Sequence, residues 1–187
     1  MTLSALPEDI RTIAIRLPYR VGLFISRSDS SGGGESDVAE MLALTNVVTY
    51  YVEDFCKSEF AQSVKLETLR HKPDWANWGE GIENVPQECR KVFDALTGQV
   101  DMRDIVAFKN NLLEIAITVA MAYREFDSSE PLAAKLRVYF DVLMRQMRAM
   151  LKGEVAESFD QMLNISRSEK AAINQLAQTL DIQYKVG

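Results

Sequence analysis

Residues 101–126 read DMRDIVAFKNNLLEIAITVAMAYREF, and this stretch decides the fold. Its apolar side chains recur at spacings of three and four, and from Leu112 to Ala120 they occupy nearly every side of a helix. A helix that is apolar all round must be covered by other elements. We therefore expect a long central helix over 101–126 with the other helices packed around it.

The same stretch argues against a membrane span. Its longest apolar run, Leu112 to Tyr123, contains Glu114 and is shorter than the roughly 20 residues that a transmembrane helix needs. The segment Met1 to Ile10 carries acids early and lacks the basic and apolar regions of a signal peptide. We therefore expect a cytoplasmic protein without a transmembrane segment.

Helical spacing continues on both sides of this stretch, and no strand-like alternation is seen. Pro18 lacks a backbone N–H and clashes with the preceding turn, so we expect one helix to end near Arg16 and another to begin at Pro18. The sequence predicts an all-α fold, a single domain over 1–187 formed by a compact bundle of seven or eight helices. The other segments with helical spacing are 8–28, 38–57, 58–70, 87–96, 132–152, 154–163 and 166–180, the last opened by a capping-box pattern from Ser166 to Glu169.

Composition excludes one class of partner. The formal net charge is -6 and the sequence has no basic stripe, so we expect no nucleic-acid binding. Cys56 and Cys89 match no CxxC or zinc spacing, and we interpret them as reduced thiols on helices.

Residues 71–86 interrupt the helical pattern as an irregular loop that holds two prolines, two glycines and two tryptophans. Large aromatic side chains in such a loop are usually buried against the core. We therefore expect Trp75 and Trp78 to anchor the loop rather than to bind a ligand.

A second interruption, 29–37, is rich in glycines and acids. Three consecutive glycines are costly inside a helix, so we expect a loop between two helices. Counted from Asp29, oxygen-bearing residues fall at the first, third, seventh, ninth and twelfth places, with Gly34 sixth, which is close to the spacing of a calcium-binding EF-hand loop. The candidate ligands for a divalent cation, calcium or magnesium, are Asp29, Ser31, Glu35, Asp37 and Glu40.

Two positions of this loop depart from the calcium-binding pattern. Gly33 offers no side-chain oxygen at the fifth place, and Ser36 stands where a small apolar residue normally fixes the loop to its partner. An alternative therefore stays open, a mobile glycine linker whose Glu35 and Asp37 favour a helix N-terminus through the helix dipole. Phosphate is a poor candidate, because no Gly-Lys-Ser/Thr follows the glycines and the acids would repel an anion.

The acidic turn also supports a family resemblance. An apolar helix, then Ser28-Asp29, then Glu35 or Asp37 at the start of another helix resembles TerB-like proteins, the helical family named for tellurite resistance. In that family, Ala-rich helices run into Asp-Gly before a glutamate opens the next helix. The Ala-rich closing stretch from Ile165 to Ile182 is similar to the closing helix of that family.

The closing stretch would be a second copy of the acidic-turn pattern, but it departs from the family. Leu163-Asn164 stands where Asp-Gly would be, which leaves Glu169 as the matching acid. The resemblance covers both ends of the chain and leaves the tryptophan-bearing loop unmatched. It implies a compact bundle with a pseudo-repeat, and divalent-cation binding in a stress-response or signalling module.

The leading hypothesis is therefore a non-enzymatic module that binds a divalent cation and a protein partner. The first alternative is a helical enzyme or small-ligand-binding protein with a pocket near Glu114. A buried carboxylate is costly, so Glu114 would need a partner such as Lys109, Arg124 or an ion, unless it faces a groove open to water.

Other catalytic candidates are few. His71 is the single histidine, so a Cys–His nucleophile would need Cys56 or Cys89 beside it in space. Glu53 and Asp54 are the remaining candidate carboxylate pair. We interpret His71 as a solvated loop residue.

The second alternative is a structural homodimer. Met144, Met147 and Met150 recur at a spacing of three between Val142 and Leu151. Methionine adapts to varied shapes, so this face is a candidate for core, dimer interface or partner surface.

Overall fold

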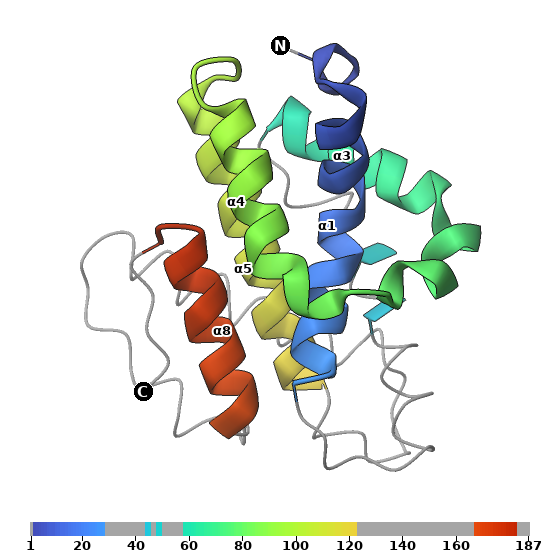
Figure 1. Cartoon of the computed structure of the whole chain (residues 1–187), viewed down its shortest axis with the longest axis vertical. Helices are drawn as coiled ribbons and strands as arrows, with labels where there is room; N and C mark the ends of the chain where they lie inside the picture. The colour runs from blue at the N-terminus through green and yellow to red at the C-terminus, as the bar shows by residue number, and fades with distance from the viewer. Residues whose placement is uncertain (1, 29–43, 46–47, 50–57, 123–166, 183–187) are drawn as a thin grey trace.

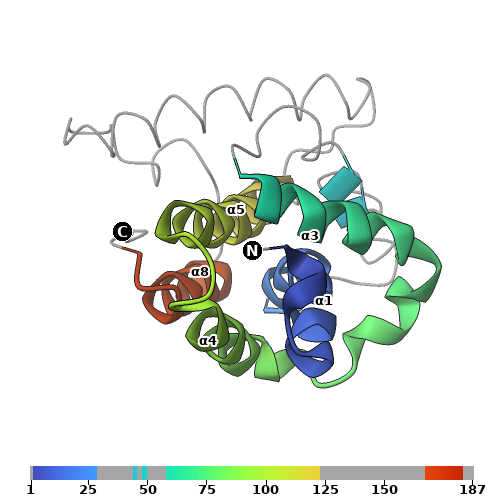
Figure 2. The same ribbon diagram turned by 90° about the horizontal axis from the view of Figure 1, so that it is seen from above.

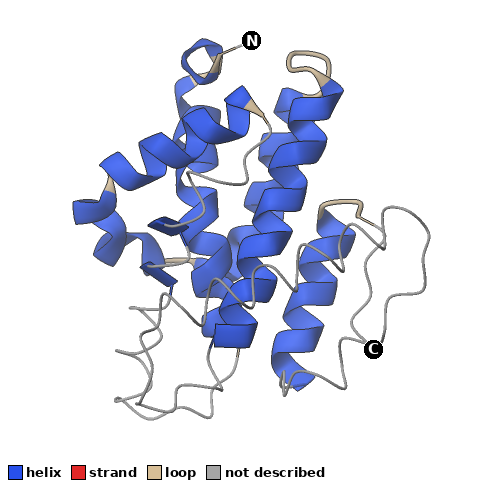
Figure 3. Cartoon of the chain, turned by 180° about the vertical axis from the view of Figure 1, so that it is seen from behind, coloured by secondary structure: helices blue, strands red, loops and turns tan. Residues whose placement is uncertain are grey.

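The computed structural model describes residues 2–28, 44–45, 48–49, 58–122 and 167–182. Every regular element in these ranges is helical, and none of them contains a strand (Figure 3). The all-α prediction is confirmed for this part of the chain. The elements are η1 (Leu3–Ala5), α1 (Glu8–Ser26), α3 (Glu59–Arg70), η2 (Lys72–Gly79), η3 (Ile82–Asn84), α4 (Val85–Leu96), α5 (Met102–Ala122) and α8 (Arg167–Thr179).

Several predicted segments fall outside these ranges. The helices expected at 132–152 and 154–163, with the methionines of 142–151, are among them, as is most of 38–57. The expected number of seven or eight helices counts these segments too.

α1 corrects the prediction of a helix break at Pro18. The helix continues from Glu8 to Ser26 through that proline, which is buried. A proline inside a helix costs about 3 kcal/mol, but Ala14, Leu17 and Val21 on the two sides of it are fully buried in one core, and burying several apolar side chains outweighs that cost. The Thr68 hydroxyl of α3 also donates to the Ile15 carbonyl oxygen at 2.6 Å, in the turn of α1 that precedes Pro18.

The core of the described part is shared between α1 and α5. α1 contacts α3, α4, α5 and α8, and α5 packs on α1, α3 and α8 and also meets Phe93 of α4 through Phe108 and Lys109. In Figures 1 and 2, α1, α4, α5 and α8 run along roughly the same direction and α3 crosses them. The buried apolar residues of α5 are Ile105, Phe108, Leu112, Leu113, Ile115, Ala116, Ile117, Val119 and Ala120.

α1 and α5 approach each other closely at Gly22. A Cβ atom at this position would overlap the Leu44 Cδ1 and lie 3.2 Å from the Val119 Cγ2. The lack of a side chain therefore allows the two helices to pack directly against each other.

Local sequence signals explain where α3 and α4 begin and end. Ser58 is the N-cap of α3, and its hydroxyl oxygen accepts a hydrogen bond from the Ala61 backbone N–H at 3.2 Å. α4 begins with proline in its first turn and ends at Leu96, just before Gly98, which has a φ of 79°. None of the helices in the described ranges combines the length and apolar character needed to cross a membrane.

Candidate functional site

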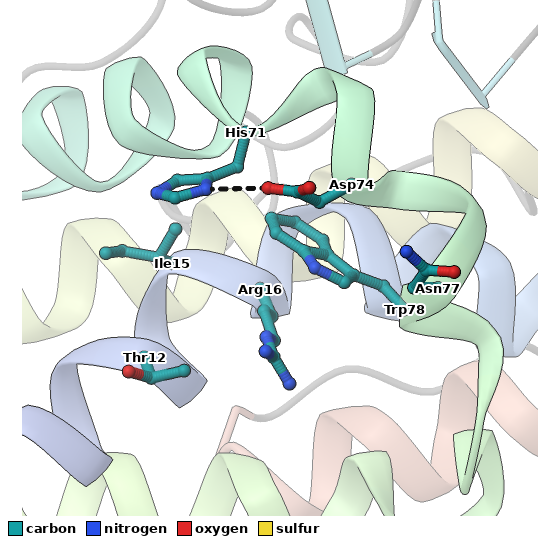
Figure 4. A pocket seen from close by; sticks show the side chains of 7 residues that line it. All are labelled: Thr12, Ile15, Arg16, His71, Asp74, Asn77 and Trp78. Carbon is teal, nitrogen blue, oxygen red and sulfur yellow. Dashed lines mark hydrogen bonds and ion pairs between the residues drawn. The ribbon is translucent and has the colours of Figure 1, made fainter.

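A pocket of about 340 Å³ lies between α1 and the 3-10 helix η2 (Figure 4). Three of its side chains come from α1 and occupy positions i, i+3 and i+4, which lie on one face of a helix. The other four come from His71 and from η2. The lining residues are Thr12, Ile15, Arg16, His71, Asp74, Asn77 and Trp78.

Two buried tryptophans hold η2 against α1. Trp75 and Trp78 are each 5% exposed, so the prediction that they anchor this loop is confirmed. Trp75 stacks on Tyr19 with ring centroids 4.5 Å apart, and its Nε1–H donates to the Thr68 carbonyl oxygen at 3.0 Å. Trp78 meets the edge of Tyr19 at 6.0 Å. The loop expected to be irregular is thus organised as η2 and η3, which gives the pocket a rigid wall.

Tyr19 is the centre of this aromatic cluster and lies in α1, directly after Pro18. It is 1% exposed, and burial raises the pKa of its phenol, while the positive charge of Arg27 partly opposes that rise. Tyr19 is therefore a neutral, buried support for both tryptophans at neutral pH.

Arg20 fixes the far end of η2. Its side chain is buried and pairs with both carboxylate oxygens of Glu88 in α4, at 2.8 and 3.0 Å. The same guanidinium donates to the carbonyl oxygens of Glu80 and Gly81 at 2.8 Å each, and to that of Trp78. One side chain thus joins α1, α4 and the 78–81 turn, and its planar fork matches these acceptors in a way that lysine could not.

The pocket holds a hydrogen-bonded pair on one side and a single cation on the other. His71 Nδ1 donates to Asp74 Oδ2 at 3.1 Å, and both side chains are about half exposed. The guanidinium carbon of Arg16 lies 5.7 Å from the centre of the Trp78 ring, a cation–π contact. Figure 4 shows the indole of Trp78 between the His71–Asp74 pair and Arg16.

These groups can bind a ligand through complementary charges. In the neutral imidazole whose Nδ1–H is donated to Asp74, the Nε2 atom is an acceptor, so this side of the pocket offers acceptors. Arg16 offers donors on the other side. A divalent cation is disfavoured here because the pocket holds two candidate ligands and a guanidinium.

The predicted metal site cannot be placed on this geometry. Asp29, Ser31, Glu35, Asp37 and Glu40 all lie outside the described residues, as do Glu53, Asp54 and Cys56. Within the described ranges, His, Cys, Asp and Glu do not gather in groups of three or more that could hold a metal.

Glu114 lies elsewhere, on α5. It is 8% exposed, so the interpretation of Glu114 in a groove open to water is wrong. It is not part of the wall of the α1–η2 pocket. Its proposed partner Lys109 instead places its ammonium 5.4 Å from the centre of the Phe93 ring, and Arg124 lies outside the described residues.

Cys89 is a core residue of α4. It is fully buried, and burial together with the charge of Glu88 raises the pKa of its thiol to about 12. The thiolate is the nucleophilic form, so Cys89 is inert at neutral pH, and it does not line the pocket that contains His71.

Sequence reasoning missed this pocket, including Arg16 and Asp74. A signal was present in the three-residue spacing of His71 and Asp74 beside two tryptophans. The contribution of α1 could not be seen, because Pro18 led us to predict a break just after Arg16.

Comparisons with protein-family models, with curated proteins and with solved structures find no match to this chain. The resemblance to TerB-like proteins therefore stays a prediction.

Proposed function

We propose that this chain is a non-enzymatic helical binding module whose α1–η2 pocket receives a small ligand. The observation that carries the proposal is the meeting of Arg16, His71 and Asp74 at one cavity whose wall is held in place by buried tryptophans. Concave sites with few polar groups and a preformed wall are typical of ligand binding.

Binding is favoured over catalysis by the exposure and chemistry of the pocket. Its charged side chains are open to water, whereas catalytic groups gain most from a site that excludes water. Cys89, the nucleophile that a Cys–His mechanism would need among the described residues, is buried away from His71.

The chain provides its own probe for this proposal. It has two tryptophans, of which Trp78 lines the pocket and Trp75 is buried beside it, so the tryptophan emission of the unaltered chain reports on the pocket through Trp78. Titration with small carboxylates, amines, amino acids and neutral polyols should give a saturable change in tryptophan fluorescence for at least one class. The same ligand should raise the melting temperature of the wild-type protein, because it binds the native state. If no class produces either effect, the proposal is wrong.

The acidic glycine loop supports a second proposal, in line with the TerB-like resemblance. We propose that Asp29, Ser31, Glu35, Asp37 and Glu40 hold calcium or magnesium, and that the bundle of seven or eight helices acts in stress response or signalling with a protein partner. The support is the spacing of oxygen-bearing residues in the sequence.

Metal titration tests this second proposal. Calcium or magnesium should raise the melting temperature, and an Asp29→Ala/Glu40→Ala variant should lose the effect. Asp94→Ala, which removes an exposed acid of α4, is the control that should keep it. An unchanged melting temperature at millimolar metal would exclude the site.

Light scattering at low protein concentration tests the homodimer alternative, which predicts twice the monomer mass.

A further inference from the structure

Arg16 is an oriented cation with no anionic partner in the described part of the chain. Its guanidinium contacts the Trp78 ring, and no ion pair or hydrogen bond joins it to another described residue. Stacking on an aromatic face leaves the N–H groups at the guanidinium edge free to donate. Two parallel N–H groups match the two oxygens of a carboxylate.

Asp74 is the complementary group across the pocket. One of its oxygens accepts from His71, and no second hydrogen bond to its side chain is found among the described residues. The second oxygen of Asp74, together with His71 Nε2 in the neutral imidazole, suits a ligand group that donates hydrogen bonds or carries positive charge. They also disfavour a phosphate dianion, which the Asp74 carboxylate would repel.

The space between these groups is small and partly apolar. Ile15 is half-buried and lines the pocket together with Trp78, and a cavity of about 340 Å³ is at the lower end of the range for small-molecule sites. A polypeptide segment would need a longer groove, so a single small molecule fits better.

From these observations we infer that the α1–η2 pocket binds a small amphoteric molecule of the α-amino acid class. The ligand carboxylate pairs with Arg16, its ammonium group faces Asp74 and His71, and its side chain lies against Ile15 and Trp78. This inference rests on the proposed ligand-binding function and names the chemistry of the ligand.

A matched set of three probes tests the charge pattern. L-phenylalanine carries both charged groups, 3-phenylpropionate lacks the ammonium group, and phenethylamine lacks the carboxylate. L-phenylalanine should bind the full chain at least about tenfold more tightly than either analogue, because a charge-assisted hydrogen bond is lost in each. Calorimetry or tryptophan fluorescence of the unaltered chain measures the three affinities, and glycine and L-leucine extend the series to smaller side chains.

Two variants test which side chain of the pocket binds each charged group of the ligand. Arg16→Gln should weaken L-phenylalanine about tenfold or more and leave phenethylamine nearly unchanged, whereas Asp74→Asn should weaken L-phenylalanine and leave 3-phenylpropionate unchanged. Arg90→Gln and Asp94→Asn make the same charge changes at exposed positions of α4 and should have no effect. Melting curves of all four variants confirm that each is folded.

The inference is overturned if the three amino acids fail to bind at millimolar concentration, or if an analogue with one charged group binds as tightly as L-phenylalanine. It is also overturned if Arg16→Gln has no more effect than Arg90→Gln. If only a neutral or singly charged molecule binds and changes the tryptophan fluorescence, the proposed function is still supported. If no class of molecule gives a response, both the proposed function and this inference are contradicted.

Discussion

Replacing Arg20 by methionine should destabilise the protein strongly, because one side chain joins three elements. The guanidinium is 6% exposed and makes five hydrogen bonds, two to Glu88 and three to backbone carbonyl oxygens of the 78–81 turn. Removing one partner of a buried ion pair typically costs about 3–5 kcal/mol, since the other charge is left without compensation.

The structure places this variant at the lower end of that range. The Glu88 side chain is 25% exposed, so water can partly solvate its charge once Arg20 is gone. We therefore expect a loss of about 3 kcal/mol in the free energy of unfolding, a large part of the 5–15 kcal/mol of a typical domain. Arg20→Lys should lower the free energy of unfolding by less than Arg20→Met does. An ammonium group keeps the positive charge, but it cannot reach all five acceptors.

Urea denaturation followed by circular dichroism and by tryptophan fluorescence measures both the global and the local effect. The circular dichroism midpoint should fall, and the native emission should move to the red as η2 loosens around Trp78. Lys91→Met is the matched control, because it breaks the Lys91–Asp9 pair, which is equally short at 2.9 Å but exposed on both sides. If Arg20→Met lowers the free energy of unfolding no more than Lys91→Met does, Arg20 does not hold α1, α4 and the 78–81 turn together, and our explanation of the pocket wall is wrong.

The further predictions concern three buried positions of the core. Gly22→Ala should destabilise by about 1–3 kcal/mol through overpacking against Leu44 and against Val119 of α5, measured by urea denaturation, and an unchanged midpoint would contradict the close packing of these two side chains on Gly22. Asn111 is 2% exposed and neither polar atom of its side chain has a hydrogen-bond partner among the described residues, so Asn111→Leu should raise the melting temperature; a fall would mean that the amide is satisfied. In a Cys56→Ser background, Cys89 should react with a thiol reagent only as fast as the protein opens, and rapid labelling of the native state would contradict its burial. Because the folded pKa of Cys89 is raised to about 12, its contribution to stability should be lost as pH rises above about 9, and the alkaline loss of stability should be smaller in Cys89→Ala, where the buried Tyr19 still contributes to it.

The fold class was predictable because helical periodicity is a local property. The spacing of apolar residues over 101–126 predicted a buried helix, and α5 is buried along most of its length. The start of α3 at Ser58 and the end of α4 before Gly98 follow equally local capping signals. Pro18 defeated the local reasoning, because tertiary packing on both sides of the proline keeps α1 continuous.

The pocket could not be predicted because it depends on two elements that are distant in the sequence. Trp75 and Trp78 were recognised as anchors from their residue type, but the surface they would meet was not known. Only the folded structure brings His71 and Asp74 to the face of α1 that holds Arg16. The acidic glycine loop, in contrast, was singled out by composition, and its ligand set stays a prediction outside the described residues.

The most direct test of the proposed pocket is a two-dimensional NMR spectrum of the two indole N–H groups during an amino-acid titration. Trp78 lines the pocket, whereas Trp75 is buried beside it with its N–H donated to the Thr68 carbonyl oxygen, so Trp75 is an internal control. L-phenylalanine should shift the Trp78 indole signal in a saturable way and leave the Trp75 signal nearly in place, and Arg16→Gln should weaken the response. If L-phenylalanine binds without moving the Trp78 signal, or does not bind, the assignment of the α1–η2 pocket as an amino-acid site is contradicted.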